Sequence, residues 1–417
     1  MGKLRLAHGT RADRADELNS TAWPDSLVPA SMNCPLHCTG CAILLIRDPL
    51  SALSSGHTGC RGLLIPPDAI VCQRQGGRSA SFPGKGTEMS TALITGATGF
   101  VGRHVAEILL HEGWEVHALR RPTSMRYLEA WSGLKWFEGD IRSARDVGRA
   151  MEGCSAVFHV AADYRLWCPR PDEIYENNVS GTEVILAEAL KQKVHRVVYT
   201  STVGALGLLD DGTASCESTP VSFCDMVGHY KRSKFLAERK VEEYLDRGLP
   251  VVMVHPSTPI GPGDHKPTPT GRIIVDFLNG RIPAYVETGL NLVHVRDVAV
   301  GHYLAYERGK VGEKYILGNQ NLSLAALFRL LERLSGRKAP RVKLPYTPVL
   351  VLAALEHWRS QLLNAEPVVC LEAVKMAKRL MFFDASKAVA ELGLPQTPVE
   401  KALIEAVEWY VRHGYVK

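Results

Sequence analysis

The feature that most restricts the fold of this chain is a glycine-rich turn between a short apolar segment and an amphipathic one. Residues 91–95 (TALIT) are typical of a buried strand, and the sequence Gly96-Ala-Thr-Gly99-Phe-Val-Gly102 follows directly. Beyond the turn, the apolar residues recur at helical spacing, which predicts a helix that packs on a sheet; they are Val101, Val105, Ile108 and Leu109. A glycine turn between a strand and a helix is the pattern that binds the pyrophosphate of a dinucleotide.

Each glycine of this turn has a physical role in that pattern. Gly96 permits the tight turn, and Gly99 lets backbone N–H groups approach a pyrophosphate at the helix N-terminus. Gly102 lets the helix lie close to the strand. We therefore expect residues 96–102 to form a phosphate-binding turn.

Strands and helices alternate after this turn. Strands are predicted over 115–119, 134–137, 155–160, 195–200 and 251–255. Long helices are predicted over 171–192 and 226–245. Such alternation indicates an α/β protein with a Rossmann-type, doubly wound parallel sheet, in which ligands bind beyond the C-terminal ends of the strands. We place this dinucleotide-binding domain at residues 89–262 and a smaller, interleaved α/β lobe at residues 263–417.

The first 88 residues differ from the rest of the 417-residue chain, because they show no sustained helix or strand period and hold five of its ten cysteines. We expect a disordered leader, or upstream sequence joined by a misplaced start, since Met89 directly precedes the first strand. Cys34, Cys38 and Cys41 have a spacing that also suits a four-iron cluster, or a zinc site with Cys60. We favour neither site. The iron cluster would need a barrel-shaped domain around this loop, for which the segment before the next domain is too short, and the spacing to Cys60 is loose for zinc. The other cysteines show no ligand spacing, and we expect no metal site.

The composition limits the classes of partner that this chain can be expected to bind. The formal net charge of +5 is small for this length and no basic stripe is present, so we expect no nucleic acid. The apolar runs are too short for a transmembrane segment. Two further segments, residues 349–358 and 376–383, are strongly apolar. We expect them to be ordinary core; the alternatives are the wall of a pocket or a contact with lipid.

Two arginines indicate the form of the cofactor. An NAD-selective site carries an acidic residue after the second strand, whereas this chain has Arg120-Arg121, which suits the 2′-phosphate of NADP. The alternative is a pair of solvated arginines in an NAD enzyme. Asp140 ends the third strand and lies where a carboxylate can meet the adenine. Ala161 and Ala162 are small enough for a cofactor to pass close to the backbone.

A candidate proton-transfer pair follows. Tyr230 and Lys234 are four residues apart on one face of a predicted helix. A lysine ammonium and a nicotinamide cation favour the phenolate and so lower the pKa of a tyrosine toward the working range. The hydroxyls of Thr200-Ser201-Thr202, at the end of the preceding strand, can hold a substrate oxygen.

The motifs GATGFVG, HVAA, NVSGT, YTSTVGALG, Y-x3-K and HPSTPIGPGD occur in the order found in one family. Over about residues 89–415 the chain resembles the extended short-chain dehydrogenases/reductases, the NAD-dependent epimerase/dehydratase family. Longer stretches, such as HVAADYRLW and GHYKRSKFLAE, resemble the bacterial hopanoid-associated sugar epimerase, which is related to dihydroflavonol 4-reductase.

The resemblance implies roles for individual residues. Tyr230 would be the acid/base, Lys234 would bind the nicotinamide ribose, and Thr202 stands where the family usually has serine, with Ser201 as the alternative. The implied cofactor contacts are Gly96, Thr98, Gly99, Phe100, Val101, Gly102, Arg120, Asp140, Ile141, Val160, Ala161, Asn178, Tyr230, Lys234, Pro256 and Thr258. Residues 263–417 would form the substrate lobe, and Tyr164 and Arg272 are expected substrate contacts.

From this resemblance we expect an NAD(P)-dependent oxidoreductase or epimerase, with NADP favoured, that acts on a sugar or sugar nucleotide in hopanoid biosynthesis. The alternatives are an NADPH-dependent ketone reductase of the dihydroflavonol-reductase type and a catalytically silent NAD(P)-sensing protein. Family members pair through two helices, which begin here near Pro171 and Met226, so we expect a homodimer. We expect it in the cytoplasm, either free or peripheral at the inner face of the membrane.

Overall fold

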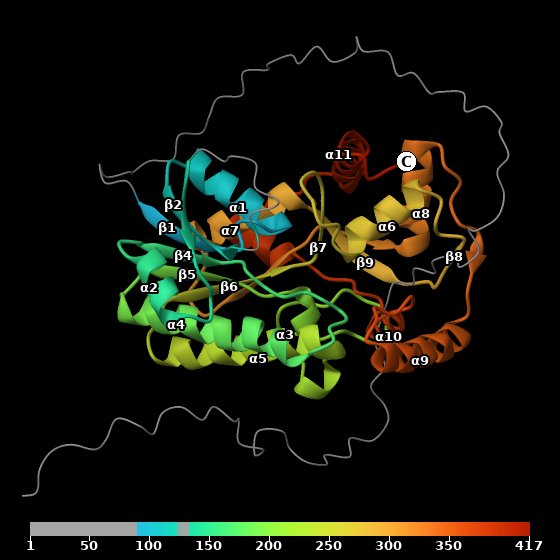
Figure 1. Ribbon diagram of the computed structural model, residues 1–417. Helices are drawn as coiled ribbons and strands as arrows, with labels where there is room; N and C mark the ends of the chain where they lie inside the picture. Colours follow the sequence, from blue (N-terminus) through green and yellow to red (C-terminus); the bar gives the residue numbers. More distant parts are fainter. Residues whose placement is uncertain (1–89, 123, 125–132) are drawn as a thin grey trace, which may run out of the picture. The chain divides into compact units, whose positions relative to one another are not determined.

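The computed structural model describes residues 90–122, 124 and 133–417 (Figure 1). The predicted leader, with Cys34, Cys38, Cys41 and Cys60, lies outside the described residues.

A parallel sheet of seven strands carries the glycine turn. Its strands are β1 (Thr91–Thr95), β2 (Glu115–Arg120), β3 (Leu134–Glu138), β4 (Ala156–His159), β5 (Arg196–Thr200), β6 (Val251–Pro256) and β10 (Lys314–Leu317). They lie in the order β10-β6-β5-β4-β1-β2-β3, and every neighbouring pair is parallel. This confirms the predicted Rossmann-type sheet. The chain order reverses between β1 and β4, which is where such sheets bind their ligands.

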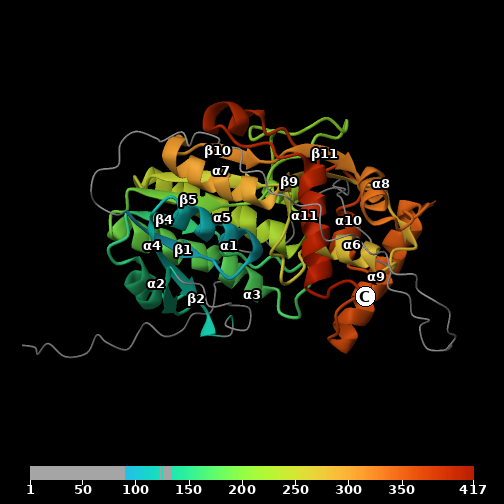
Figure 2. The same ribbon diagram turned by 90° about the horizontal axis from the view of Figure 1, so that it is seen from above.

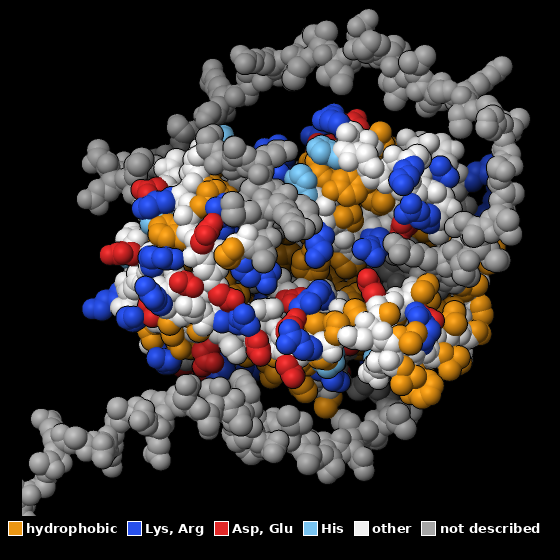
Figure 3. All heavy atoms as spheres, viewed as in Figure 1, with side chains coloured by type: hydrophobic (Ala, Val, Ile, Leu, Met, Phe, Trp, Pro, Cys, Tyr) orange, Lys and Arg blue, Asp and Glu red, His pale blue; other side chains and the backbone are white. Residues whose placement is uncertain are grey.

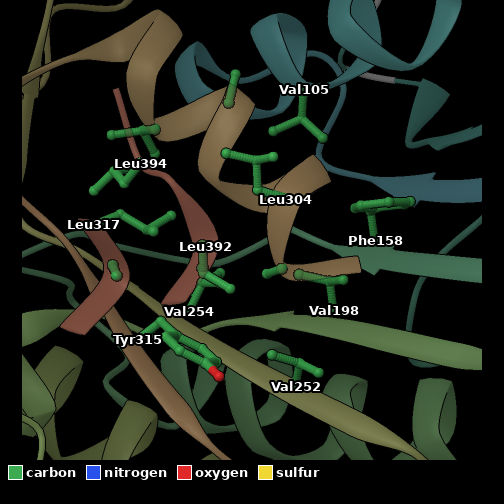
Figure 4. Close-up of a cluster of buried hydrophobic side chains, with 14 of the residues drawn as sticks. Val105, Phe158, Val198, Val252, Val254, Leu304, Tyr315, Leu317, Leu392 and Leu394 are labelled. Carbon is green, nitrogen blue, oxygen red and sulfur yellow. The ribbon is translucent and has the colours of Figure 1, made fainter. Parts of the chain in front are cut away.

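Helices cover both faces of this sheet (Figure 1), and Figure 2 looks down onto one of these faces. One face carries α1 (Phe100–His111) and α7 (Val295–Arg308), and the other carries α2 (Ala144–Met151), α4 (Gly181–Lys191) and α5 (Gly228–Asp246). Side chains alternate between the faces along each strand, so Ile94 belongs to the first core and Leu93 to the second. Figure 4 shows part of the first core, where Leu304 of α7 lies over the strands.

The predicted helix over 171–192 consists of three consecutive segments. These are α3 (Asp172–Tyr175), a π-helical turn η3 (Glu176–Ser180) and α4. A π-helical turn adds a residue to the helix and so rotates the side chains on either side of it relative to each other. Asn178 lies in this turn and is buried.

The remaining elements form a second group around smaller sheets. Its strands are β7 (Thr258–Ile260), β8 (Ala284–Tyr285), β9 (Gly289–His294), β11 (Gln320–Ser323) and β12 (Val342–Lys343), with β7, β9 and β11 in one sheet and β8 and β12 in another. Its helices are α6 (Pro269–Leu278), α8 (Leu324–Ser335), α9 (Tyr346–Leu363), α10 (Leu371–Lys375) and α11 (Val399–Arg412). Short helical turns are η4 (Val203–Ala205), η5 (Phe223–Asp225) and η6 (Ala388–Leu392).

The expectation that residues 349–358 are ordinary core is wrong for most of that segment. It lies in α9, where Val349 and Ala353 are buried but Val351, Leu355 and Trp358 are exposed. Within residues 90–122, 124 and 133–417, no helix combines the length and apolar character needed to cross a membrane.

Candidate active site

The glycine turn between β1 and α1 leaves no room for side chains. Gly96 has φ +79°, and a Cβ atom there would lie 2.7 Å from the backbone nitrogen of Ala161. A Cβ on Gly102 would lie 2.1 Å from the carbonyl oxygen of Gly96. Gly99 is the N-cap of α1 and supplies no side-chain cap, so the first N–H groups of the helix stay available to an anion. Thr98, Phe100 and Val101 are half-buried in the same turn.

Arg120 lies at the C-terminal end of β2 with its guanidinium over the Trp136 ring, 4.9 Å from the ring centroid. Its Nη2 donates to Glu138 Oε1 at 3.3 Å, and the Glu138 side chain is 53% exposed. An exposed carboxylate can rotate away at little cost, because surface ion pairs contribute little. Arg120 therefore forms only a weak ion pair with Glu138 at this edge of the sheet.

Asp140 is held by a neighbouring arginine. Arg142 donates from Nε and Nη2 to the two carboxylate oxygens of Asp140, at 3.0 and 2.8 Å, and these bonds lower the pKa of Asp140. Arg142 also reaches Glu176 at 2.8 Å. Asp140 is thus an ionised carboxylate whose acceptors are shared with Arg142. The adjacent Ile141 packs against Gly181 at the start of α4.

Tyr230 lies in the first turn of α5 and interacts with two hydroxyl side chains. Burial raises the pKa of Tyr230 to about 12, a hydrogen bond with the Thr202 hydroxyl acts against this rise, and the phenol of Tyr164 adds to it. Tyr164 is 40% exposed. Tyr230 is therefore a neutral phenol at pH 7 in the unliganded protein, with a hydroxyl partner and an exposed tyrosine nearby.

Lys234 lies one turn further along α5 and is buried. Its Nζ donates to the Tyr199 hydroxyl and to the Thr200 carbonyl, both at 2.7 Å. Burial lowers the pKa of Lys234 to about 7, and the nearby carboxylate of Glu238 opposes that shift. The charge on Lys234 therefore changes near neutral pH.

The three hydroxyls at the end of β5, from Thr200 to Thr202, have three different neighbours. Thr200 Oγ1 bonds His302 Nε2 at 2.9 Å, Ser201 Oγ donates to Glu238, and the Thr202 hydroxyl lies near the Tyr230 phenol. Thr202 also accepts from the Gly204 backbone at 3.1 Å, which fixes its rotamer. The structure thus places Thr202 beside the tyrosine and turns Ser201 away from it.

Asn178 uses its amide to fix the loop after β4. Its Oδ1 accepts from the Asp163 backbone N–H at 2.7 Å, and its Nδ2 donates to the Asp163 carbonyl and to Ser233 Oγ, both at 2.9 Å. The residue therefore ties the segment that includes Ala161 and Tyr164 to α5.

The other predicted contacts lie as follows. Val160 and Ala161 follow β4 and are half-buried beside the glycine turn. Pro256 ends β6, and Thr258 begins β7. Arg272 lies on α6 with an exposed side chain.

A buried polar network was missed from the sequence. Glu238 accepts from Lys314 Nζ at 2.7 Å and pairs with His255 Nε2 at 3.0 Å, besides its bond from Ser201. Burial on its own raises the pKa of Glu238, but the contacts with His255 and Lys314 outweigh it and bring the pKa to about 2. The available signal was the spacing, because Glu238 lies four residues after Lys234 and so shares its face of α5.

A second buried chain of side chains supports the cofactor edge. His159 bonds Thr95 Oγ1 at 2.7 Å and Thr182 Oγ1 at 2.9 Å, and burial lowers its pKa to about 3. Thr95 also accepts from the Ala161 backbone at 3.2 Å. The neutral imidazole thus links β1, β4 and α4. Among the described residues, no group of histidine, cysteine or acidic side chains could hold a metal ion.

The fold and this site define a dinucleotide-dependent enzyme of the extended short-chain dehydrogenase/reductase class. The family model described as "NAD dependent epimerase/dehydratase family" matches residues 92–318. This chain belongs to that family.

Several relatives resemble the chain over most of its length. It is 44% identical to "Putative dihydroflavonol 4-reductase" of Synechocystis over 333 residues, which cover 78% of this chain and 96% of the relative. It is 32% identical to "Sterol demethylase protein B" of Methylococcus capsulatus over 329 residues, covering 78% and 100%. The crystal structure of gox2253 matches with 45% identity and a TM-score of 0.72, covering 79% and 100%.

Proposed function

We propose that this enzyme transfers a hydride from NADPH to a ketone carbon and releases the alcohol. The observation that carries the proposal is the Thr202 hydroxyl near the Tyr230 phenol, with Lys234 one turn further along the same helix. A protonated phenol held by a second hydroxyl is the arrangement that can bind and protonate a carbonyl oxygen. The identity to a relative whose name is that of a reductase supports the same reaction.

The residues present fit the dinucleotide, because the turn at Gly96 and Gly102 has space only for backbone against backbone. The bound nicotinamide supplies the hydride that the reduction requires. Thr202 orients the substrate oxygen, and Tyr230 gives that oxygen its phenolic proton as the carbon is reduced. Lys234 stabilises the phenolate left on Tyr230, which is then reprotonated from solvent.

We propose that Arg120 selects NADP. Arg120→Ala should raise the KM for NADPH about tenfold and leave the KM for NADH unchanged, because only NADPH carries a 2′-phosphate for the guanidinium. Steady-state kinetics with both cofactors measures this. Arg412→Ala, on α11, is the control and should change neither constant. Equal loss with both cofactors would contradict the assignment.

The second candidate is the epimerisation of a sugar or sugar nucleotide in hopanoid biosynthesis. The family name and the long stretches similar to the hopanoid-associated epimerase support it. The same Tyr230 would then remove a proton from a sugar hydroxyl and later return it, with no net oxidation.

One experiment separates the two reactions. The purified enzyme is incubated with NADPH and a panel of soluble ketones, and separately with UDP-sugars. Stoichiometric loss of NADPH with formation of alcohol supports the reductase. A tightly held NAD that co-purifies, with UDP-sugar converted and no net absorbance change, would contradict it and support the epimerase.

We further propose a homodimer that works in the cytoplasm, at the inner face of the membrane. The dimer rests on the family's use of the helices that are α4 and α5 here. Sedimentation velocity tests it, and a monomer at all concentrations would contradict it.

A further inference from the structure

Helix α9 (Tyr346–Leu363) has two apolar faces, of which only one is packed. Val349, Ala353 and Ser360 share the buried face. Val349 and Ala353 belong to a small core with Val286, Val369, Val374 and Ala377. Helices of globular proteins normally place polar residues opposite such a face.

The opposite face of α9 is apolar instead. Val351, Leu355, Trp358 and Leu362 follow one another at i, i+4, i+7 and i+11, which aligns them in one stripe. Their exposed fractions are 56%, 62%, 66% and 67%. Figure 3 shows this gathering of apolar side chains where Figure 1 places α9. We call these four residues the α9 stripe.

Basic residues precede and follow α9 in the sequence. Residues 337–379 contain eight lysines and arginines and three glutamates. The exposed ones before the helix are Arg337, Lys338, Arg341 and Lys343, and those after it are Lys375 and Lys378. Of the glutamates, Glu356 is paired with Arg359 at 2.8 Å. An exposed apolar helix flanked by basic side chains has the chemistry that binds an anionic bilayer surface.

The same segment contacts the candidate active site. A Cβ on Gly228, two residues before Tyr230, would lie 2.1 Å from Glu372 Oε2 of α10. Cys370 Sγ donates to the Leu166 carbonyl at 3.9 Å, in the loop that carries Tyr164. A surface docked through α9 would therefore lie next to the elements that hold Tyr230 and Tyr164.

We propose that the α9 stripe docks the enzyme on an anionic lipid bilayer, so that the ketone substrate comes from the membrane. The docking follows from the stripe and its basic flanks, and the membrane-borne substrate rests on the proposed function. The apolar side chains insert among the lipid headgroups and acyl chains, while the lysines and arginines pair with the anionic headgroups.

The test is flotation of the full chain with vesicles of phosphatidylcholine alone and of phosphatidylcholine with phosphatidylglycerol in equal parts. We expect binding to the anionic vesicles, weakened by salt. The double variant Leu355→Glu with Leu362→Glu should bind at least about tenfold more weakly, because each leucine loses its apolar burial in the bilayer. Lys338→Gln with Arg341→Gln should weaken binding to the anionic vesicles alone.

The matched control is Val311→Glu with Val411→Glu, which changes exposed apolar residues elsewhere and should bind as the wild type does. NADPH binding, measured by fluorescence, shows that each variant is folded. Absence of vesicle binding by the wild type would overturn the proposal. So would a wild-type dimer that Leu355→Glu with Leu362→Glu converts to a monomer, since a second copy would then occupy the stripe. Turnover of soluble ketones is scored separately, so a failed reductase assay leaves the docking result intact.

Discussion

At the scale of single residues, the acidity of Tyr230 depends on what surrounds its phenol. Burial holds the pKa near 12 in the unliganded protein, and the Thr202 hydroxyl is the contact that lowers it. Lys234 has a pKa of about 7 and is partly neutral at working pH. A proton donor for ketone reduction needs this protonated phenol, so the unliganded site is already in the protonation state for that direction.

Replacing Tyr230 by phenylalanine tests this role. Tyr230→Phe should lower kcat at least about a hundredfold, because the proton for the substrate oxygen is lost, while NADPH affinity stays near the wild-type value. Tyr244→Phe, a buried tyrosine on the same helix, should leave both unchanged. A cellular phenotype that persists in the Tyr230→Phe strain would instead favour the NAD(P)-sensing alternative.

The choice between Ser201 and Thr202 could not be made from the sequence. Both hydroxyls follow the same strand, and their directions depend on partners that are distant in the chain, Glu238 for one and Tyr230 for the other. The Tyr230–Lys234 pair, in contrast, depends only on helical spacing and was predictable.

At the scale of elements, the alternation of apolar segments predicted the parallel sheet, because strands buried on both faces read as short continuous apolar runs. Two features depended on tertiary packing and were not predictable. The π-helical turn η3 lies inside an otherwise regular helical pattern, and α9 has a core-like composition but exposes one face.

Glu238 joins α5 to β10 and β6 through Lys314 and His255. Its pKa falls from 4.5 to about 2 on folding, so the stability that it contributes is complete above pH 4.5 and is lost as the pH falls toward 2. That contribution is of the order of 3 kcal/mol at pH 7. Glu238→Gln should therefore lower the free energy of unfolding by about this amount.

Denaturant unfolding of both proteins between pH 7 and pH 2 measures the effect. The difference in the free energy of unfolding between the wild type and Glu238→Gln should shrink as the pH falls from 4.5 toward 2, where Glu238 becomes protonated. Glu243→Gln changes an exposed carboxylate on the same helix and should alter the free energy of unfolding by less than about 0.5 kcal/mol. Parallel pH profiles for wild type and Glu238→Gln would contradict the role of the network.

At the scale of the whole molecule, the seven-stranded sheet and the second group of elements are interleaved along the chain. β10 comes from beyond residue 262 yet lies beside β6, and α10 contacts the start of α5. A change at the α9 surface can therefore act on the site through α10. The fold alone does not select ketone over sugar, because one tyrosine and one hydroxyl serve both reactions.

The most direct test of the account is the fate of the transferred hydrogen. The enzyme is given NADPH that carries deuterium at the transferable position of its nicotinamide ring, together with a soluble ketone, and the product is examined by mass spectrometry. We predict an alcohol with one deuterium on the carbinol carbon and a matching yield of NADP. Absence of deuterium from the alcohol, or conversion of a UDP-sugar with no consumption of NADPH, would contradict the proposed reduction.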